Sequence, residues 1–287
     1  MRVLVTGAAG MLGTDLCIVL AETAGTEFTA LDRGALDITD PDAAAAAVAG
    51  HDLVVNCAAW TNVDLAETEE EQATAINGTG PRNLAAACAG AGARFLQPST
   101  DYVFPGDATA PIPEDTPTAP LNAYGRSKLA GEQAVLELLP ETGYVVRTAW
   151  LYGAHGPNFV ATMLRLAGER DTLDVVDDQV GQPTSTAALA RQLVLLGRAA
   201  LAGRAPAGVY HGTAAGQTSW HGLAAAAFEL AGLDPARVRP TTSAAFVRPA
   251  KRPGYSVLAH GGWQRAGLEP MADWHEELTA AFKSGVF

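Results

Sequence analysis

The stretch RVLVTGAAGMLG, residues 2–13, runs from a short β-branched segment into three glycines, Gly7, Gly10 and Gly13. Arg2–Thr6 predicts a strand, and the apolar spacing of Met11–Ala21 predicts a helix. Between a strand and a helix, the first glycine permits a tight turn, the second lets the backbone approach a pyrophosphate, and the third lets the helix pack on the strand. The helix N-terminus offers free N–H groups to phosphates. The spacing is GxxGxxG rather than GxGxxG, so an ordinary glycine-rich turn remains the alternative.

The alternation of strand and helix continues to about residue 150. Further strands are predicted at Phe28–Leu31, Asp52–Asn56, Arg94–Gln97 and Tyr144–Thr148, and helices at Ala43–Val48, Glu69–Ala91 and Ala123–Leu139. Apolar strands that alternate with helices are typical of a parallel sheet covered on both faces. The sequence therefore predicts an α/β fold, a Rossmann-like doubly wound parallel sheet with a smaller C-terminal substrate-binding region.

The pattern loosens after residue 150. Helices are expected at Asn158–Gly168, Ser185–Ala202, Ser219–Ala231 and Asp273–Lys283, and short strands at Leu173–Val176 and Val209–His211. We expect residues 1–150 to form an NAD(P)-binding domain and residues 151–287 to form mainly the substrate-binding region. Late helices such as 185–202 should return to cover the sheet.

Composition excludes several classes of protein. Of the 287 residues, 48% are hydrophobic and 17% charged, which excludes a disordered chain. The net charge of −12 argues against nucleic-acid binding but permits a locally basic pocket. No apolar stretch approaches the ~20 residues of a membrane helix, and the N-terminus lacks the pattern of a signal peptide, so we expect no membrane contact and a cytoplasmic location. Three cysteines without a CxxC pair, and six histidines without HxxxH, predict neither disulfides nor a metal site.

The ends of the second and third predicted strands carry further candidates for a dinucleotide site. Asp32 could bind the adenosine ribose of NAD, whereas Arg33 could accept the 2′-phosphate of NADP or simply be a solvated surface arginine. Cofactor choice thus stays open between NADPH and NADH. The complete set expected to contact the cofactor is Gly7, Gly10, Met11, Leu12, Gly13, Asp32, Arg33, Asp37, Ile38, Cys57, Ala58, Ala59, Tyr124 and Lys128.

Tyr124 and Lys128 in AYGRSK form a second constellation. Their separation of four residues places both side chains on one face of a helix. A phenol is a reluctant proton donor or acceptor at neutral pH, and a nearby ammonium would lower its pKa. The preceding strand ends near Thr100, whose hydroxyl could bind a carbonyl oxygen. Such a Tyr–Lys pair is common by chance, but here it follows a dinucleotide motif and a hydroxyl at a strand end.

Six motifs occur in the order expected of one enzyme family: TGAAGMLG, NCAAWTNVDLAE, STDYVF, YGRSK, DQVGQPT and RPGYSVL. The chain resembles the extended short-chain dehydrogenases/reductases, and within them the dTDP-4-dehydrorhamnose reductase family, from Arg2 to about Trp274. The resemblance implies a catalytic set of Thr100, Tyr124 and Lys128. It also implies reduction of a dTDP-4-keto-6-deoxy sugar, dTDP-4-dehydro-L-rhamnose, with NADPH and with NADH as a possible substitute.

The same resemblance implies a substrate site. Asp101 and Tyr102 would lie at the substrate, Trp150 would pack against the sugar or deoxyribose, and Arg252 would approach the diphosphate. Gln182, with Pro183 and Thr184, would line the nucleotide-sugar cleft. A turn residue, a core tryptophan and a surface arginine are the respective alternatives for Asp101, Trp150 and Arg252. Trp60 departs from the tyrosine that the family most often carries.

Two other functions stay open. One is a reductase for another dTDP-sugar, such as the dihydrostreptose precursor of antibiotic synthesis. The other is a non-catalytic regulatory subunit like that of methionine adenosyltransferase, against which the intact set of Thr100, Tyr124 and Lys128 argues. The sequence permits either a monomer or a homodimer.

Because Asp32 and Arg33 stand together, we predict that both NADPH and NADH support turnover. Replacing Arg33 by alanine should then weaken NADPH more than NADH, since only NADPH carries a 2′-phosphate. Steady-state KM values for the two cofactors test this. An equal loss for both would mean that Arg33 does not contact the 2′-phosphate.

Overall fold

Six parallel strands form the central sheet, in the order β10-β5-β4-β3-β1-β2. The computed structural model describes residues 1–287. The strands are β1 (Arg2–Thr6), β2 (Glu27–Leu31), β3 (Leu53–Asn56), β4 (Arg94–Thr100), β5 (Gly143–Thr148) and β10 (Gly208–His211). The strand order reverses between β1 and β3, and ligands of open α/β sheets bind at the carboxyl ends of the strands beside such a reversal.

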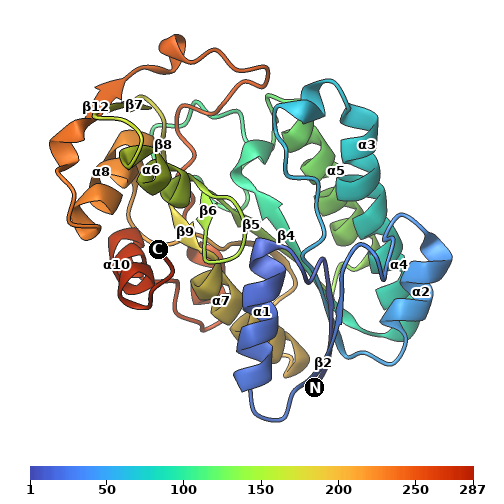
Figure 1. Cartoon of the computed structure of the whole chain (residues 1–287). Helices are drawn as coiled ribbons and strands as arrows, with labels where there is room; N and C mark the ends of the chain where they lie inside the picture. The colour runs from blue at the N-terminus through green and yellow to red at the C-terminus, as the bar shows by residue number, and fades with distance from the viewer.

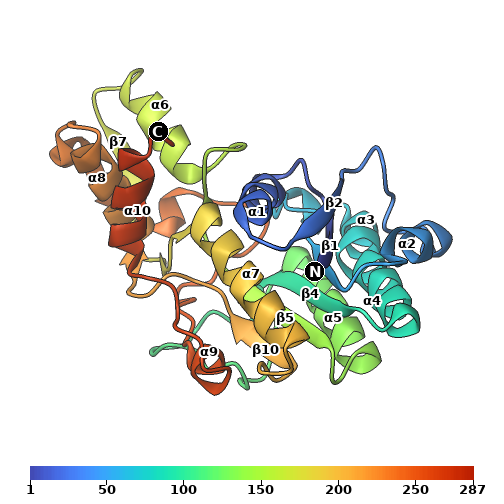
Figure 2. The same cartoon turned by 90° about the horizontal axis from the view of Figure 1, so that it is seen from below.

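Helices cover both faces of the sheet (Figures 1 and 2). One face packs on α1 (Met11–Glu22) and α7 (Thr186–Leu201), and the other on α2 (Pro41–Val48), α4 (Gly80–Ala91) and α5 (Ala123–Leu138). The strands are apolar on both sides because each face lies in a core: Val3 and Val5 face α1, and Leu4 faces α4. The predicted α/β class and doubly covered parallel sheet are confirmed.

The helix expected over 69–91 is interrupted. Helix α3 (Glu70–Thr74) passes into a π-helical turn (Ala75–Thr79) before α4 begins. Pro81 has no N–H to donate, and its ring would clash with the carbonyl four residues earlier in a regular α-helix. Gly80 sits against Ile38, where an added Cβ would lie 2.4 Å from Ile38 Cδ1. The turn places the buried Asn77 beside the loop that follows β3.

A second group of elements packs beside the sheet. It contains α6 (Phe159–Ala167), α8 (Trp220–Leu230), α10 (Trp274–Lys283) and three two-stranded pairings; α9 (Gly261–Arg265) lies near β10 instead. The pairs are β6 (Leu151–Tyr152) with β9 (Thr184–Ser185), β7 (Leu173–Val176) with β12 (Val238–Thr241), and β8 (Val180–Gly181) with β11 (Thr218–Ser219). Two later elements, β10 and α7, lie with the central sheet. The division of the chain into two domains at residue 150 stays a prediction. No helix is long and apolar enough to span a membrane.

A buried ion pair joins α5 to β5. Arg147 and Glu132 are 4% and 1% exposed, and Arg147 Nη2 donates to Glu132 Oε2 at 2.7 Å while Nε donates to Oε1 at 3.0 Å. The guanidinium also lies over the Phe104 ring, 4.8 Å from its centroid, and Nη1 donates to the Glu114 carbonyl. These contacts satisfy the cation on several sides, as a buried charge requires.

We predict that Glu132→Ala destabilises the protein by about 3–5 kcal/mol, because it leaves Arg147 buried without its counter-ion. Glu137→Ala is the matched control on the same helix: its ion pair with Arg82, at 2.9 Å, is exposed, and exposed pairs contribute about 0–1 kcal/mol. Urea denaturation of both variants measures the difference. Equal losses would contradict the proposed importance of the buried pair.

Candidate active site

A row of buried polar groups crosses the carboxyl ends of three neighbouring strands. Thr6 Oγ1 donates to Asn56 Oδ1 at 2.6 Å, and Asn56 Nδ2 donates to Gln97 Oε1 at 2.8 Å. The Pro98 carbonyl then accepts from Gln97 Nε2 and from Lys128 Nζ, both at 2.8 Å. The row links the end of β1 to a lysine on α5, so it fixes the glycine loop and Lys128 relative to each other.

The glycine loop is built for close approach. Gly7 has φ +63°, and a Cβ on it would lie 2.4 Å from Ala58 N; a Cβ on Gly13 would lie 2.3 Å from Gly7 O. Gly10 is different, because its added Cβ would meet only Gly7 O at 3.3 Å. Gly10 also precedes α1 without a side-chain cap, so the first N–H groups of α1 remain available to an anion. These features fit the pyrophosphate of a dinucleotide.

The residues expected around the adenosine lie after β2. Asp32 Oδ1 accepts from Gly34 N and Ala35 N at 2.9 and 3.1 Å, so this carboxylate shapes its own turn, while Arg33 is exposed. Asp37 lies on the same loop, and hydrogen bonds from Thr39, helped slightly by the charge of Arg33, lower its pKa.

The other residues of the expected cofactor set lie within or beside the core. Ile38 is buried against α4, and Leu12 is buried in α1 next to Met11. Ala58 and Ala59 follow Cys57 at the end of β3, and burial raises the pKa of the Cys57 thiol to about 12. This thiol is therefore neutral at physiological pH and unsuited to act as a nucleophile.

The expected proton donor and hydroxyl group meet at the end of β4. Thr100 is its last residue, and Thr100 Oγ1 donates to Asp101 Oδ1 at 3.0 Å. Burial raises the pKa of Tyr124 to about 12; the charge of Asp101 adds to this shift, and the Thr100 hydroxyl opposes it. The phenol of Tyr124 therefore stays protonated at neutral pH, the form that a proton donor needs.

Lys128 follows Tyr124 by one helical turn on α5 and is 5% exposed. Burial lowers its pKa to about 8, with the charge of Glu132 acting in the opposite direction. The lowering of the Tyr124 pKa that we expected from Lys128 is not found, because the ammonium donates to the Pro98 carbonyl and burial dominates at the phenol.

Asp101 lies deepest of these groups, at 2% exposure. Burial raises its pKa to about 6, and the nearby Ser256 and Thr100 hydroxyls oppose the shift. Its Oδ2 atom is buried without a hydrogen-bond partner. This carboxyl group therefore titrates slightly below neutral pH, directly beside Thr100.

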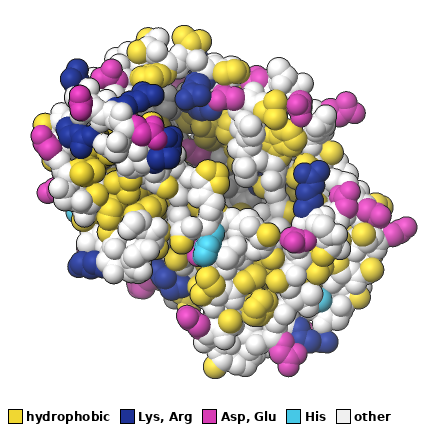
Figure 3. Space-filling view, viewed as in Figure 1, with side chains coloured by type: hydrophobic (Ala, Val, Ile, Leu, Met, Phe, Trp, Pro, Cys, Tyr) yellow, Lys and Arg dark blue, Asp and Glu magenta, His cyan; other side chains and the backbone are white.

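A cavity of about 1050 Å³ opens next to this strand end, and Figure 3 shows the hollow between the two parts of the molecule. Tyr102 lines it; its ring packs edge-on against Tyr124, with centroids 5.6 Å apart, and the Arg252 guanidinium lies 6.0 Å from its centroid. The charged side chains along the wall are Arg170, Arg248, Lys251, Arg252, Asp64 and Asp174. Four cations against two carboxylates give a net charge of +2, in a protein of net charge −12.

Trp150 follows β5, and its expected contact with the sugar or deoxyribose stays a prediction. Its backbone has φ +48°, which is uncommon for a residue other than glycine and often marks a functional site. Its ring stacks on Trp220, with centroids 3.6 Å apart, and Phe159 packs against Trp220 with centroids 4.6 Å apart. An added Cβ at Gly181 would lie 2.6 Å from Trp150 Cε2, so the glycine of DQVGQPT makes room for the indole. Trp220 and Phe159, rather than Trp150, line the cavity.

Gln182 is 2% exposed, and its amide is occupied within the protein. Oε1 accepts from Leu258 N and Thr213 Oγ1, and Nε2 donates to Leu258 O. Thr184, which is fully buried, donates to Gln182 O. Here Gln182 holds the late segment around Leu258; contact of Gln182, Pro183 and Thr184 with a substrate stays a prediction.

The chain is similar to known proteins over nearly its whole length. The model of the RmlD substrate binding domain family matches residues 1–286. The chain belongs to this family. It is 60% identical over 283 residues to a dTDP-4-dehydrorhamnose reductase of Streptomyces griseus, covering 98% of this chain and 93% of the relative. A Streptomyces niveus protein named dTDP-4-keto-6-deoxy-D-glucose reductase is 50% identical, with 98% and 96% covered. The crystal structure of a Bacillus anthracis dTDP-4-dehydrorhamnose reductase in complex with NADP superposes with a TM-score of 0.93 at 39% identity, covering 99% of both chains.

The sequence did not predict the contacts of three polar side chains, Asp64, Glu67 and Asn77, around the segment that follows β3. Asn77 binds the backbone of Trp60 in both directions, at 2.9 and 3.0 Å, and also Ser127. Glu67 accepts from Ala123 N at 2.8 Å, one residue before Tyr124. Asp64 pairs with Arg252 at 3.0 Å. The family motif NCAAWTNVDLAE contains Asp64 and Glu67, but nothing in its spacing indicates their partners.

The raised pKa of Asp101 predicts a pH-dependent stability. Protonated Asp101 is favoured by the fold, so the wild type should lose stability relative to Asp101→Asn as the pH rises from 4 to 7, by about 2–3 kcal/mol. Denaturant unfolding at a series of pH values measures this difference, with Asp115→Asn, on an exposed loop residue, as the control for removing one carboxylate. A difference that stays constant over this range would contradict the assignment.

Proposed function

We propose that the protein reduces the 4-keto group of dTDP-4-dehydro-L-rhamnose with NADPH, giving dTDP-L-rhamnose. The observation that carries the proposal is the 60% identity, over 98% of the chain, to a relative named for this activity. The meeting of Thr100 and Tyr124 at the end of β4, beside a cationic cavity, supports it independently.

Tyr124 and Thr100 supply the acid side of the reaction. Reduction places a hydride on C4 and a proton on the C4 oxygen; the nicotinamide, when bound, supplies the hydride and leaves oxidised. Tyr124 is protonated at neutral pH, so its hydroxyl can donate the proton as negative charge builds on the oxygen. To stabilise that charge, the Thr100 hydroxyl must turn its single proton from Asp101 Oδ1 to the substrate oxygen.

Lys128 acts next to the phenol. With a pKa of about 8 it is mostly cationic at neutral pH, so it carries a positive charge at the strand end although that charge does not lower the pKa of Tyr124. Family resemblance also assigns it to the ribose of the nicotinamide nucleotide. Its anchor on the Pro98 carbonyl keeps the ammonium at this strand end.

The cavity suits an anionic nucleotide sugar. Its net charge of +2 attracts a diphosphate, and the Trp220 and Phe159 rings offer an apolar wall to a base or deoxyribose. Among the cavity cations, Arg252 lies over the ring of Tyr102, which packs against Tyr124. Asp101 and Tyr102 follow Thr100 directly, and we assign them to the sugar; Tyr102 lines the cavity.

A related dTDP-4-keto-6-deoxy sugar is the second candidate substrate, because a relative of 50% identity carries the name dTDP-4-keto-6-deoxy-D-glucose reductase. Parallel assays with both sugars, followed by loss of NADPH absorbance, distinguish the two. Lack of turnover with either sugar would instead favour the non-catalytic regulatory role.

We predict that Tyr124→Phe lowers kcat by about 10²–10⁴-fold, since it removes a positioned general acid. Affinity for NADPH should stay nearly unchanged, because only a hydroxyl is lost. Tyr144→Phe is the matched control: it removes a buried hydroxyl that donates to Ala205 O at 3.0 Å, away from the site. Steady-state kinetics and NADPH titration measure both effects, and near-normal turnover of Tyr124→Phe would contradict the mechanism.

A further inference from the structure

We infer that Asp64 is a positioning residue for the basic segment 248–252: it holds Arg252 at the cavity so that the guanidinium meets the diphosphate of the nucleotide sugar. The inference rests on the proposed function, because it assumes a nucleoside diphosphate in this cavity. Asp64 itself would not contact the reacting carbonyl.

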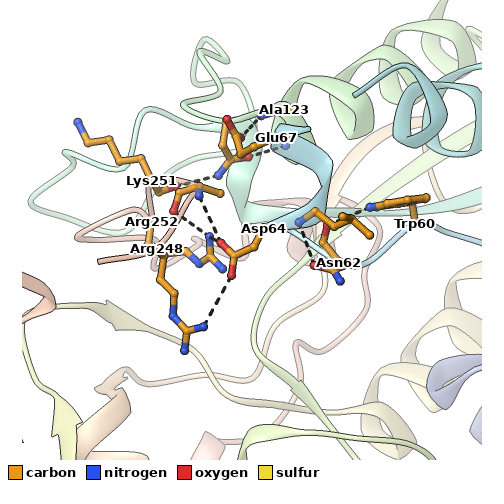
Figure 4. A network of polar contacts seen from close by, with 12 residues as sticks. Trp60, Asn62, Asp64, Glu67, Ala123, Arg248, Lys251 and Arg252 are labelled. Atoms are coloured by element: carbon orange, nitrogen blue, oxygen red, sulfur yellow. Dashed lines mark hydrogen bonds and ion pairs between the residues drawn. The ribbon is translucent and has the colours of Figure 1, made fainter. Parts of the chain in front are cut away.

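The hydrogen bonds and ion pairs of the Asp64 side chain all go to this segment (Figure 4). Its Oδ1 atom lies 3.0 Å from Arg252 Nη1 and accepts from Ala250 N at 3.3 Å, and Oδ2 lies 3.9 Å from Arg248 Nη1. One carboxylate therefore fixes the backbone at Ala250 and the side chain two residues later.

Arg252 is held through one nitrogen only. Its Nη1 contacts Asp64 Oδ1 and donates to Ala250 O at 2.9 Å, whereas Nε and Nη2 make no hydrogen bond with the protein. The guanidinium is therefore fixed in orientation with donors left over, and a planar fork of donors matches the geometry of a phosphate.

The segment depends on few anchors. Val247 is 90% exposed and Phe246 is 44% exposed, so little core packing fixes the residues before Arg248. Besides Asp64, the structure ties the segment through Asn122, whose Nδ2 donates to Lys251 O at 2.9 Å. Asn122 also caps α5, two residues before Tyr124. The contacts of Asp64 and Asn122 therefore place the cationic segment relative to the proton donor.

Charge repulsion would have the opposite effect on dTDP affinity. A carboxylate beside an anion site repels the anion, so removing its charge should tighten binding. Asp174 provides the comparison, because it lines the same cavity, is exposed and makes no ion pair. If charge alone matters, Asp64→Asn and Asp174→Asn should behave alike.

The experiment measures dTDP binding by calorimetry, and KM and kcat with dTDP-4-dehydro-L-rhamnose, on the full-length chain. Asp64→Asn should weaken dTDP and raise the sugar KM by about tenfold, the size of coupling found between residues in contact. The kcat and the NADPH affinity should stay within about twofold, because groups at the reacting carbonyl are unchanged. Asp174→Asn should instead tighten dTDP.

A double-mutant cycle with Arg252→Gln separates positioning from a general loss of structure. If Asp64 acts through Arg252, Asp64→Asn should cost little further dTDP affinity in the Arg252→Gln background. Thermal unfolding and NADPH binding of each variant report whether the fold is intact.

Three results would overturn the inference: unchanged or tighter dTDP binding by Asp64→Asn, a full additional loss in the Arg252→Gln background, or a loss confined to kcat. Absence of dTDP binding and of turnover in the wild type would overturn the proposed function, and this inference with it. A wild type that binds dTDP and turns over the sugar, with an Asp64→Asn variant that behaves like Asp174→Asn, would overturn the inference alone.

Discussion

The hydrogen-bonded row from Thr6 through Asn56 and Gln97 to the Pro98 carbonyl and Lys128 holds the carboxyl ends of β1, β3 and β4 in register. The three side chains between the glycine loop and Pro98 are no more than 2% exposed, so the loss of one leaves buried partners unsatisfied, at about 1–3 kcal/mol each. A dinucleotide laid over the glycine loop and a lysine on α5 must keep a fixed separation for hydride and proton to reach one carbonyl. The row provides that separation from within the sheet.

Burial determines the proton chemistry at the end of this row. It raises the pKa of Tyr124 to about 12 and that of Asp101 to about 6, and it lowers the pKa of Lys128 to about 8. The phenol of Tyr124 therefore keeps its proton at neutral pH, and Lys128 titrates about one pH unit above neutrality. The cavity beside these groups is cationic although the protein as a whole is acidic. The local positive charge therefore attracts the anionic part of a substrate to the cavity.

The late part of the chain completes the site from three directions. Lys251 is tied to the cap of α5 through Asn122, and Leu258 is held by both Nε2 and Oε1 of the Gln182 side-chain amide. Between them, Ser256 lies at the Asp101 carboxyl. Residues more than 75 positions apart thus meet around one strand end, and the geometry of the proton donor depends on segments that the sheet alone does not contain.

The sequence by itself determined the parallel sheet and the close-packed turn at Gly7. It also indicated that Thr100 and Tyr124 lie near each other at the end of one strand. These follow from local rules: hydrophobic periodicity, the space available to a Cβ, and the meeting of parallel strand ends at one edge. Only the tertiary structure decided that Asp64 pairs with Arg252 and that Lys128 donates to a backbone carbonyl instead of lowering the pKa of the phenol. A charged side chain can reach many partners, and burial together with contacts distant in sequence selects among them, which spacing along the chain does not encode.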